Sequence, residues 1–166
     1  IFSKKAIPVI ATDELHLLQL IRNQIAREGL SCSLNHIDVS NVKNMSYLFS
    51  RFRQFNGDIS QWDTSNVTSM RMMFGDSAFN NDISAWDVSN VSDMSEMFWN
   101  SLFNGNISRW DVANVTDMNA MFEQSSFDGD ISRWDVANVT DMNAMFRAST
   151  FNQNISEWNV RNVSNF

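Results

Sequence analysis

The sequence predicts an α/β solenoid of coils of about 24 residues, each with a short strand and a short helix, closed at its N-terminal end by a capping helix. Two observations support this fold class. The segment ISRWDVANVTDMNAMF occurs twice without a change, at residues 107–122 and 131–146. Tryptophan recurs with the same period, at Trp62, Trp86, Trp110, Trp134 and Trp158. A unit of this length cannot bury its own apolar face, but stacked units cover one another.

The capping helix is predicted in the segment TDELHLLQLIRNQIAREG, before the repeats begin. Thr12 is the expected N-cap and Gly29 the expected C-cap. An apolar stripe at helical spacing should cover the open end of the first coil; it consists of Leu15, Leu18, Ile21 and Ile25. We therefore divide the chain into an N-terminal segment with the capping helix, residues 1–29, and a repeat solenoid of about five coils and a partial last coil, residues 30–166.

The parts of one coil follow from the spacing of its apolar residues. In NVTDMNAMF, apolar residues lie three, three and one apart, which is typical of one face of a short helix. In ISRWDV, the apolar residues indicate the inward positions of a short extended segment, and FNGDIS supplies turn residues between coils. Seven columns stay apolar from coil to coil and should form the core; in one coil they are Ile107, Trp110, Val115, Met118, Met121, Phe122 and Phe127.

Charge and composition narrow the function. The net charge is −7, so the chain should not attract nucleic acid, and no stretch is apolar enough to predict direct membrane insertion. The single cysteine, Cys32, allows neither an internal disulfide nor a thiolate zinc cluster. The two histidines, His16 and His36, lie near the cap, and no catalytic triad, phosphate loop or metal-ligand spacing stands out. We expect no enzyme activity, no metal site and no cofactor.

Three polar columns repeat with the coils. One consists of Asp38, Asp63, Asp87, Asp111 and Asp135, and ends in Asn159. Its carboxylates are expected to bond backbone amides in turns, with calcium binding or partner contact as alternatives. A second column, beginning at Asp58, exchanges Asp and Asn freely, which favours a turn role. The third column, Asn41, Asn66, Asn90, Asn114, Asn138 and Asn162, predicts a largely buried amide ladder; glycosylation at its N-x-S/T sequons is the weaker alternative.

Residues that differ between coils are the candidates for binding a partner. Trp99 is the one tryptophan outside the ladder, and it either anchors a partner or packs on a neighbouring helix. The predicted strand face carries a varying column beside the aspartates, and it is either a recognition surface or a solvated face. The candidate partner-binding residues are Trp99, Gln61, Asp63, Asp87, Arg109, Asp111, Arg133, Asp135 and Glu157. The uncapped C-terminal end, with its apolar edge, would also allow end-to-end self-association.

The repeats FNGDISQWDTSNVTSMRMMF and FNNDISAWDVSNVSDMSEMF resemble the BspA-like bacterial surface-protein repeat, which is also found in mycoplasma lipoproteins. LNHIDVSNVKNMSYLF resembles that family's first coil after a capping helix. The resemblance implies a leucine-rich-repeat-like fold, with Trp in a leucine place and the Asn one residue early, and a cell-surface or secreted location. It implies adhesion to a host or neighbouring-cell surface protein. The expected function is a non-enzymatic protein-interaction module; the alternative is a structural spacer whose repeats set length.

Overall fold

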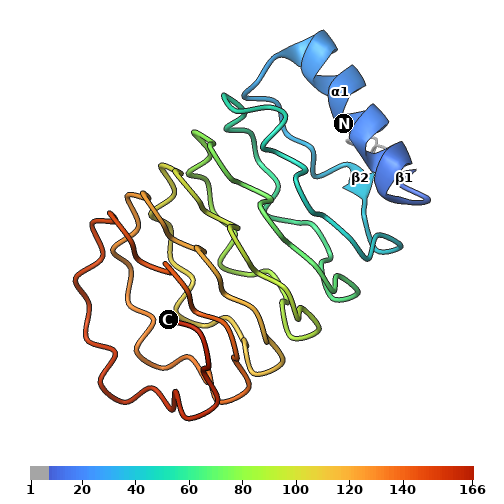
Figure 1. The fold of residues 1–166 in the computed structure, drawn as a ribbon. Coiled ribbons are helices and arrows are strands. Elements are labelled where there is room, and N and C mark those ends of the chain that lie inside the picture. Colours follow the sequence, from blue (N-terminus) through green and yellow to red (C-terminus); the bar gives the residue numbers. More distant parts are fainter. Residues whose placement is uncertain (1–7) are drawn as a thin grey trace.

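The computed structural model describes residues 8–166, which form a row of stacked coils (Figure 1). Helix α1 (Glu14–Glu28) lies across the first coil, and the C-terminus lies in the last coil. Strand β1 (Val9–Ile10) pairs in parallel with β2 (Ile37–Asp38), which ties the segment before α1 to the first coil. The first part of the predicted N-terminal segment, residues 1–7, lies outside the described residues.

Helix α1 begins one residue later than the sequence predicts. The N-cap is Asp13, not Thr12, because the Asp13 carboxylate accepts the backbone N–H of His16 at 2.8 Å. Gly29 ends the helix with φ at 86°, a left-handed backbone that suits glycine, and its N–H bonds the carbonyl of Ile25 at 2.8 Å.

The buried face of α1 is also rotated from the predicted stripe. Leu17 and Ile21, one helical turn apart, are fully buried, whereas Leu15 is 76 % exposed. Leu18 and Ile25 lie at the flanks of the contact, where they are partly buried against the core. The prediction that Leu15 covers the first coil is therefore wrong, because the helix turns a face centred on Leu17 and Ile21 toward it.

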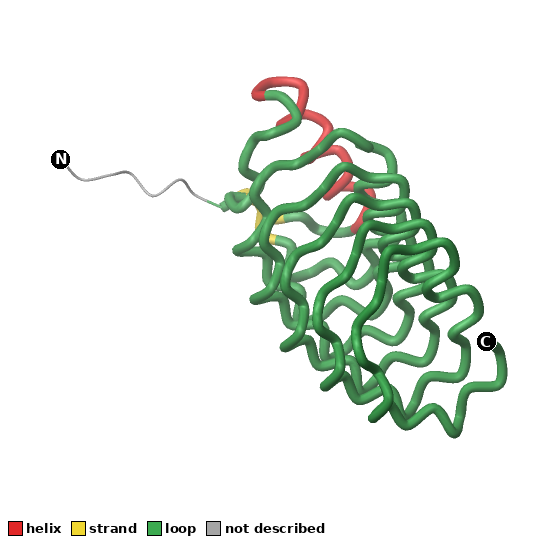
Figure 2. Tube along the Cα trace, turned by 90° about the vertical axis from the view of Figure 1, so that its left-hand side faces the viewer, coloured by secondary structure: helices red, strands yellow, loops and turns green. Residues whose placement is uncertain are grey.

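Each coil is a succession of turns, where the sequence predicts a short strand and a short helix (Figure 2). In one coil the N–H of Trp110 donates to the carbonyl of Ile107 at 3.1 Å, and later the N–H of Met121 donates to the carbonyl of Met118 at 3.2 Å. Both bonds span three residues, whereas an α-helix joins residues four apart. Successive three-residue turns give the same apolar spacing as a short helix, which is why the spacing did not separate them.

Alternate amides of the methionine-rich segment bond the next coil instead of their own. The N–H groups of Met118, Ala120 and Phe122 donate to carbonyls one coil further on, at 2.8–2.9 Å. Ala120 has φ at 51°, so the backbone there is left-handed and cannot continue a helix. One parallel β-bridge per coil continues this ladder along the whole stack, through Asn44, Ser69, Asp93, Asp117, Asp141 and Asn165.

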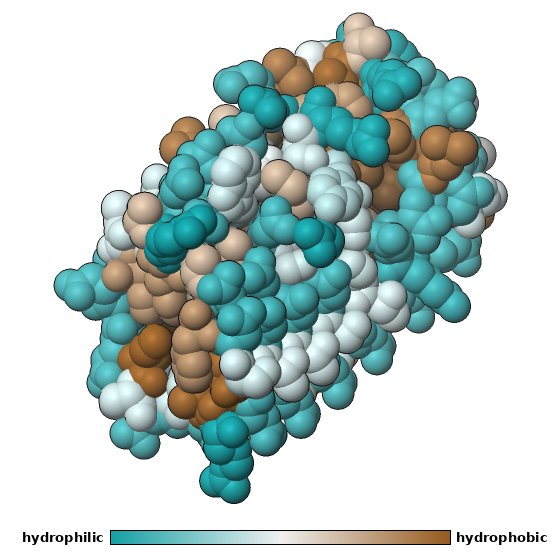
Figure 3. Space-filling view, viewed as in Figure 1, coloured by the Kyte–Doolittle hydropathy of each residue, from teal (hydrophilic) through white to brown (hydrophobic). Residues whose placement is uncertain are grey.

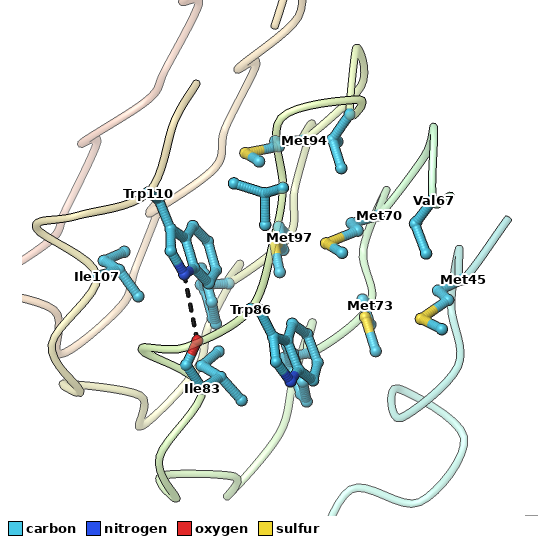
Figure 4. Close-up of a cluster of buried hydrophobic side chains, with 14 of the residues drawn as sticks. Met45, Val67, Met70, Met73, Ile83, Trp86, Met94, Met97, Ile107 and Trp110 are labelled. Atoms are coloured by element: carbon cyan, nitrogen blue, oxygen red, sulfur yellow. Dashed lines mark hydrogen bonds between the residues drawn. The ribbon is translucent and has the colours of Figure 1, made fainter. Parts of the chain in front are cut away.

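The core consists of side-chain columns that run along the stack. Phenylalanine rings of successive coils stack nearly parallel, for example Phe74 on Phe98 with centroids 5.6 Å apart. The indole N–H of Trp110 donates to the carbonyl of Ile83 in the preceding coil at 3.2 Å (Figure 4), which satisfies the polar atom of a buried tryptophan. The predicted apolar columns are thus confirmed as core, although their last members, such as Phe146 and Phe151, are only partly buried. Each Trp of the column also joins two coils.

The last coil presents an open ladder edge. The amides of Ala144 and Phe146 find no backbone acceptor within residues 8–166, whereas their counterparts Ala120 and Phe122 do. Beside this edge is a hollow of about 320 Å³, lined mostly by apolar residues such as Met145, and apolar residues gather at this end of the surface (Figure 3). End-to-end self-association of this edge remains a prediction.

Hydrogen exchange should therefore be faster at the last coil. The amides of Ala144 and Phe146 should exchange several-fold faster than those of Ala120 and Phe122, because only the latter pair must break a bond between coils to exchange. Exchange rates measured by NMR on a dilute sample test this. Equal rates that do not change with protein concentration would contradict the open edge, and rates that slow as concentration rises would indicate end-to-end association.

Candidate interaction surface

The varying column predicted on a strand lies on a turn in the structure. In each coil after the first, the side-chain oxygen of an Asp or Asn accepts the N–H of the serine two residues later, as in Asp58 with Ser60 at 3.0 Å. This bond and the turn that ends at the tryptophan bend the backbone, so no strand forms there. The column projects from these turns and is exposed in every coil. We call it the turn strip; it consists of Gln61, Ala85, Arg109, Arg133 and Glu157.

The aspartates beside the turn strip act as turn acceptors. The carboxylate of Asp87 accepts the N–H of Ser89 at 3.0 Å and its hydroxyl at 2.6 Å, and these bonds hold the pKa of Asp87 below its usual value. Asp63, Asp111 and Asp135 make the matching backbone bond. Across residues 8–166 no three acidic, histidine or cysteine side chains gather as a metal site. The turn role expected of this column is therefore observed.

The asparagine column bridges coils from the surface, not from the interior. From Asn66 onward, each Nδ2 donates to a carbonyl of the preceding coil at 2.7–2.9 Å, as in Asn114 with Ser89. The predicted burial is wrong, because valines fill the wall behind and the amides lie outside it, exposed to solvent. Burial thus gives no reason to exclude glycosylation at these sequons, although each Nδ2 from Asn66 onward is engaged with a neighbouring coil.

Trp99 is separate from the turn strip. It lies on the ladder segment of its coil, where its carbonyl accepts the N–H of Asp76 at 2.7 Å, and its side chain is half-buried. Arg147 and Glu123, in the same column of the next coils, form an ion pair. The structure therefore does not bring Trp99 together with the other predicted partner-binding residues, and it does not present Trp99 as a fully exposed anchor.

A third set of carboxylates, on the bridge ladder, was not singled out from the sequence. Asp93, Asp117 and Asp141 occupy successive coils at the same position. Burial raises the pKa of Asp117. A hydrogen bond from the backbone N–H of Asn119 lowers this pKa, and the neighbouring Asp93 and Asp141 carboxylates raise it further. The column could have been found from its regular spacing, but its like-charge stacking depends on the direct bridge pairing that the structure shows.

Asp117→Asn should stabilise the protein at neutral pH by roughly 0.2–1 kcal/mol, the usual scale for opposed like charges in a sheet. Asparagine fits this position, since Asn44 and Asn165 occupy it in other coils, and it keeps an acceptor for the Asn119 amide. A carboxyl with a raised folded-state pKa favours folding while protonated and loses that contribution as pH rises through the folded pKa. The gain should therefore vanish at pH values below the ordinary carboxyl value of 3.8.

Chemical denaturation at neutral and acidic pH measures this effect. Asp141→Asn is the matched control in the same column. A hydrogen bond from the backbone N–H of Asn143 lowers the pKa of Asp141. The charged Asp141 carboxylate therefore favours folding at pH values above its unfolded pKa. This variant should not stabilise the protein at neutral pH. Stabilisation by both variants, or by neither, would contradict the assigned cause.

Three arginines in residues 8–166 form ion pairs, and the two arginines of the turn strip are not among them. Arg53 pairs with Asp76 and Arg71 with Glu96, each at 2.6 Å. Among residues 8–166, neither Arg109 nor Arg133 forms an ion pair. With Ser108 and Asp130 they line a polar cleft of about 430 Å³ between two coils. The turn strip thus offers free positive charge in an acidic protein.

Comparison with known proteins gives one match. The model of the family described as "Mycoplasma protein of unknown function, DUF285" matches residues 22–123 and 100–166. No curated protein and no solved structure matches the chain. Within residues 8–166, α1 is too short and too polar to cross a bilayer, and no other helix is present.

Proposed function

This chain belongs to the DUF285 family of Mycoplasma proteins of unknown function, and on that premise we propose that it is a non-enzymatic module that binds a protein partner along its turn strip. Within that family we assign its repeats to the BspA-like type, with a leucine-rich-repeat-like solenoid fold. The proposed location is the cell surface or the extracellular space, and the proposed role is adhesion to a protein of a host or neighbouring cell.

The observation that carries this proposal is the contrast between constant and varying columns. The core columns keep the same residue types from coil to coil, because each ring or methionine must fit its neighbours. The turn strip faces solvent and carries Gln, Ala, Arg, Arg and Glu in successive coils. A rigid stack that presents one varying, exposed side chain per coil is suited to recognising an extended surface. The mixed charges of the turn strip would contribute specificity more than affinity.

The spacer role is the second candidate, and the aromatic columns favour it. Stacked phenylalanines run through successive coils from Phe49 to Phe146 and from Phe55 to Phe151, with neighbouring centroids 5.4–6.4 Å apart. Such an unbroken core would keep the coils in fixed register and set a constant length per repeat. For a spacer, changes in the turn strip would have no effect on binding.

A binding screen against arrayed extracellular proteins of bacteria and animal hosts tests the interaction role. The wild type should capture at least one protein, and the double variant Arg109→Glu with Arg133→Glu should lose it at an unchanged melting temperature. The control is Arg22→Glu with Arg51→Glu, which makes the same charge change at exposed arginines elsewhere and should retain binding. No partner for the wild type, or equal binding by both double variants, would overturn the proposal.

A further inference from the structure

A side chain of the first coil accepts a hydrogen bond from a backbone amide of the next coil. The backbone N–H of Gln61 donates to the side-chain oxygen Oδ1 of Asn35, which lies in the preceding coil, at 3.0 Å. Gln61 is the first member of the turn strip. Its hydrogen bond shows that its backbone N–H points toward the preceding coil. The position in front of this N–H therefore accommodates the oxygen of a planar group, such as an amide or a carboxylate.

The corresponding place at Arg133 has no such oxygen. Ser108 takes the position of Asn35, two residues before the tryptophan of the preceding coil, and its hydroxyl donates to Asn106 at 2.8 Å instead. Within residues 8–166, the N–H of Arg133 has no hydrogen-bond acceptor. Ser108, Arg109, Asp130 and Arg133 line the polar cleft of about 430 Å³ at this place.

Two arginines line the same cleft. Arg109 follows Ser108 in one coil, and Arg133 belongs to the next coil, so both reach the cleft from adjacent turns. The amide of Arg109 itself has no acceptor either, but the preceding member of the turn strip there is Ala85. Only at the cleft of Arg133 do a free amide and two unpaired guanidinium groups meet among the described coils. Such donors suit an oxyanion with charge-assisted hydrogen bonds.

Resting on the interaction role proposed above, we propose that this cleft binds the carboxylate of an acidic side chain in a protein partner. One carboxylate oxygen takes the place that the Asn35 oxygen occupies in the first coil, and the guanidinium groups contact the carboxylate from both sides. A carboxylate fits better than a phosphate, because Asp130 lines the same cleft and would repel a doubly charged group more strongly. Asp111 and Asp135 beside the cleft favour a partner segment with basic residues around its acidic one.

The test uses the whole chain and short capped peptides with one central glutamate flanked by lysines. Isothermal titration should show binding, and the Arg133 amide signal should shift in NMR spectra. Ser108→Asn copies the first coil, supplies the missing oxygen from within, and leaves both arginines in place. It should weaken binding about tenfold or more, since it removes a hydrogen bond to a charged group. Arg109→Gln with Arg133→Gln should weaken binding at least as much.

Ser84→Asn is the matched control, because it makes the same change one coil earlier, at the amide of Arg109. It should leave peptide affinity within about twofold, a difference well below the change expected from one lost charged hydrogen bond. The assignment is overturned if the wild type does not bind the glutamate peptide, if Ser108→Asn binds as well as the wild type, or if a glutamine peptide binds equally. Tighter binding of a phosphoserine peptide would overturn the carboxylate assignment in favour of phosphate.

The two proposals can fail separately. If a protein from the screen loses binding to the glutamate variants of the turn strip but binds Ser108→Asn normally, the interaction role stands and the carboxylate site is wrong. If the screen yields no partner while the peptide binds and Ser108→Asn blocks it, the carboxylate site stands and the proposed interaction role is wrong.

Discussion

Trp110→Ala should lower the free energy of unfolding by about 3–5 kcal/mol, the usual range for removing a buried aromatic side chain. The indole is 4 % exposed, its ring lies on Phe98 with centroids 6.4 Å apart, and its N–H bonds the carbonyl of Ile83. The variant would leave a void in the middle of the stack and remove one of the two hydrogen bonds that the Ile83 carbonyl accepts, the other coming from the N–H of Trp86. Neighbouring coils on both sides would lose contacts. Chemical denaturation monitored by circular dichroism measures the change.

Trp110→Phe is the control for this prediction. Phenylalanine keeps an aromatic ring in the column but cannot donate to Ile83, so its loss of stability should be clearly smaller than that of alanine. An alanine variant as stable as the wild type would show that the tryptophan column does not hold the coils together.

Gly57→Ala should be the second most damaging change, with a loss of roughly 1–3 kcal/mol or more from overpacking. A β-carbon added to Gly57 would lie 2.0 Å from the backbone carbonyl oxygen of Cys32, closer than any contact allows. Because that atom belongs to the backbone of the neighbouring segment, one coil would have to move away from the other. Thermal or urea unfolding of the variant measures the loss.

Gly105→Ala provides the matched control in a later coil. A β-carbon there would approach the ring of Phe103 at 2.7 Å, but the nearest atoms belong to a side chain. The same column holds Asn81 beside Phe79, which shows that this position accommodates a side chain. Gly105→Ala should therefore be milder than Gly57→Ala. The reverse order would contradict the close backbone approach at the first coils.

The core could be predicted from the sequence because the repeat places equivalent residues in columns. Each Trp, Val and Met must fit between the same residues of two neighbouring coils, so its type changes only in the first coil, where Ile37 and Leu48 take a Trp and a Met place. The turns could not be separated from short helices, because both give a three-residue apolar spacing. The left-handed backbone at Tyr47, Met72 and Glu96 has no signal in their residue types, since glycine and asparagine are the residues that favour it.

The candidate surface was predicted in part. The varying column and the aspartates beside it were found from the sequence, because exposed positions tolerate differences between coils. The free amide of Arg133 was not found, since it depends on which side chain of the preceding coil reaches it: Asn35 reaches Gln61, and Ser108 does not reach Arg133. The exposure of Asn114 was also missed, because the direction of an amide that bonds a backbone carbonyl is not visible in a repeat pattern.

A hydrogen-exchange footprint of the protein bound to a partner from the binding screen tests the central claim most directly. The amides of Arg109 and Arg133 lack acceptors in residues 8–166 and should exchange rapidly in the free protein. The account predicts that the bound partner slows hydrogen exchange at these two amides. Exchange at the backbone amides of Asn66 and Asn90 should not change. Protection confined to other segments, with Arg109 and Arg133 still exchanging rapidly, would contradict the turn strip as the binding surface.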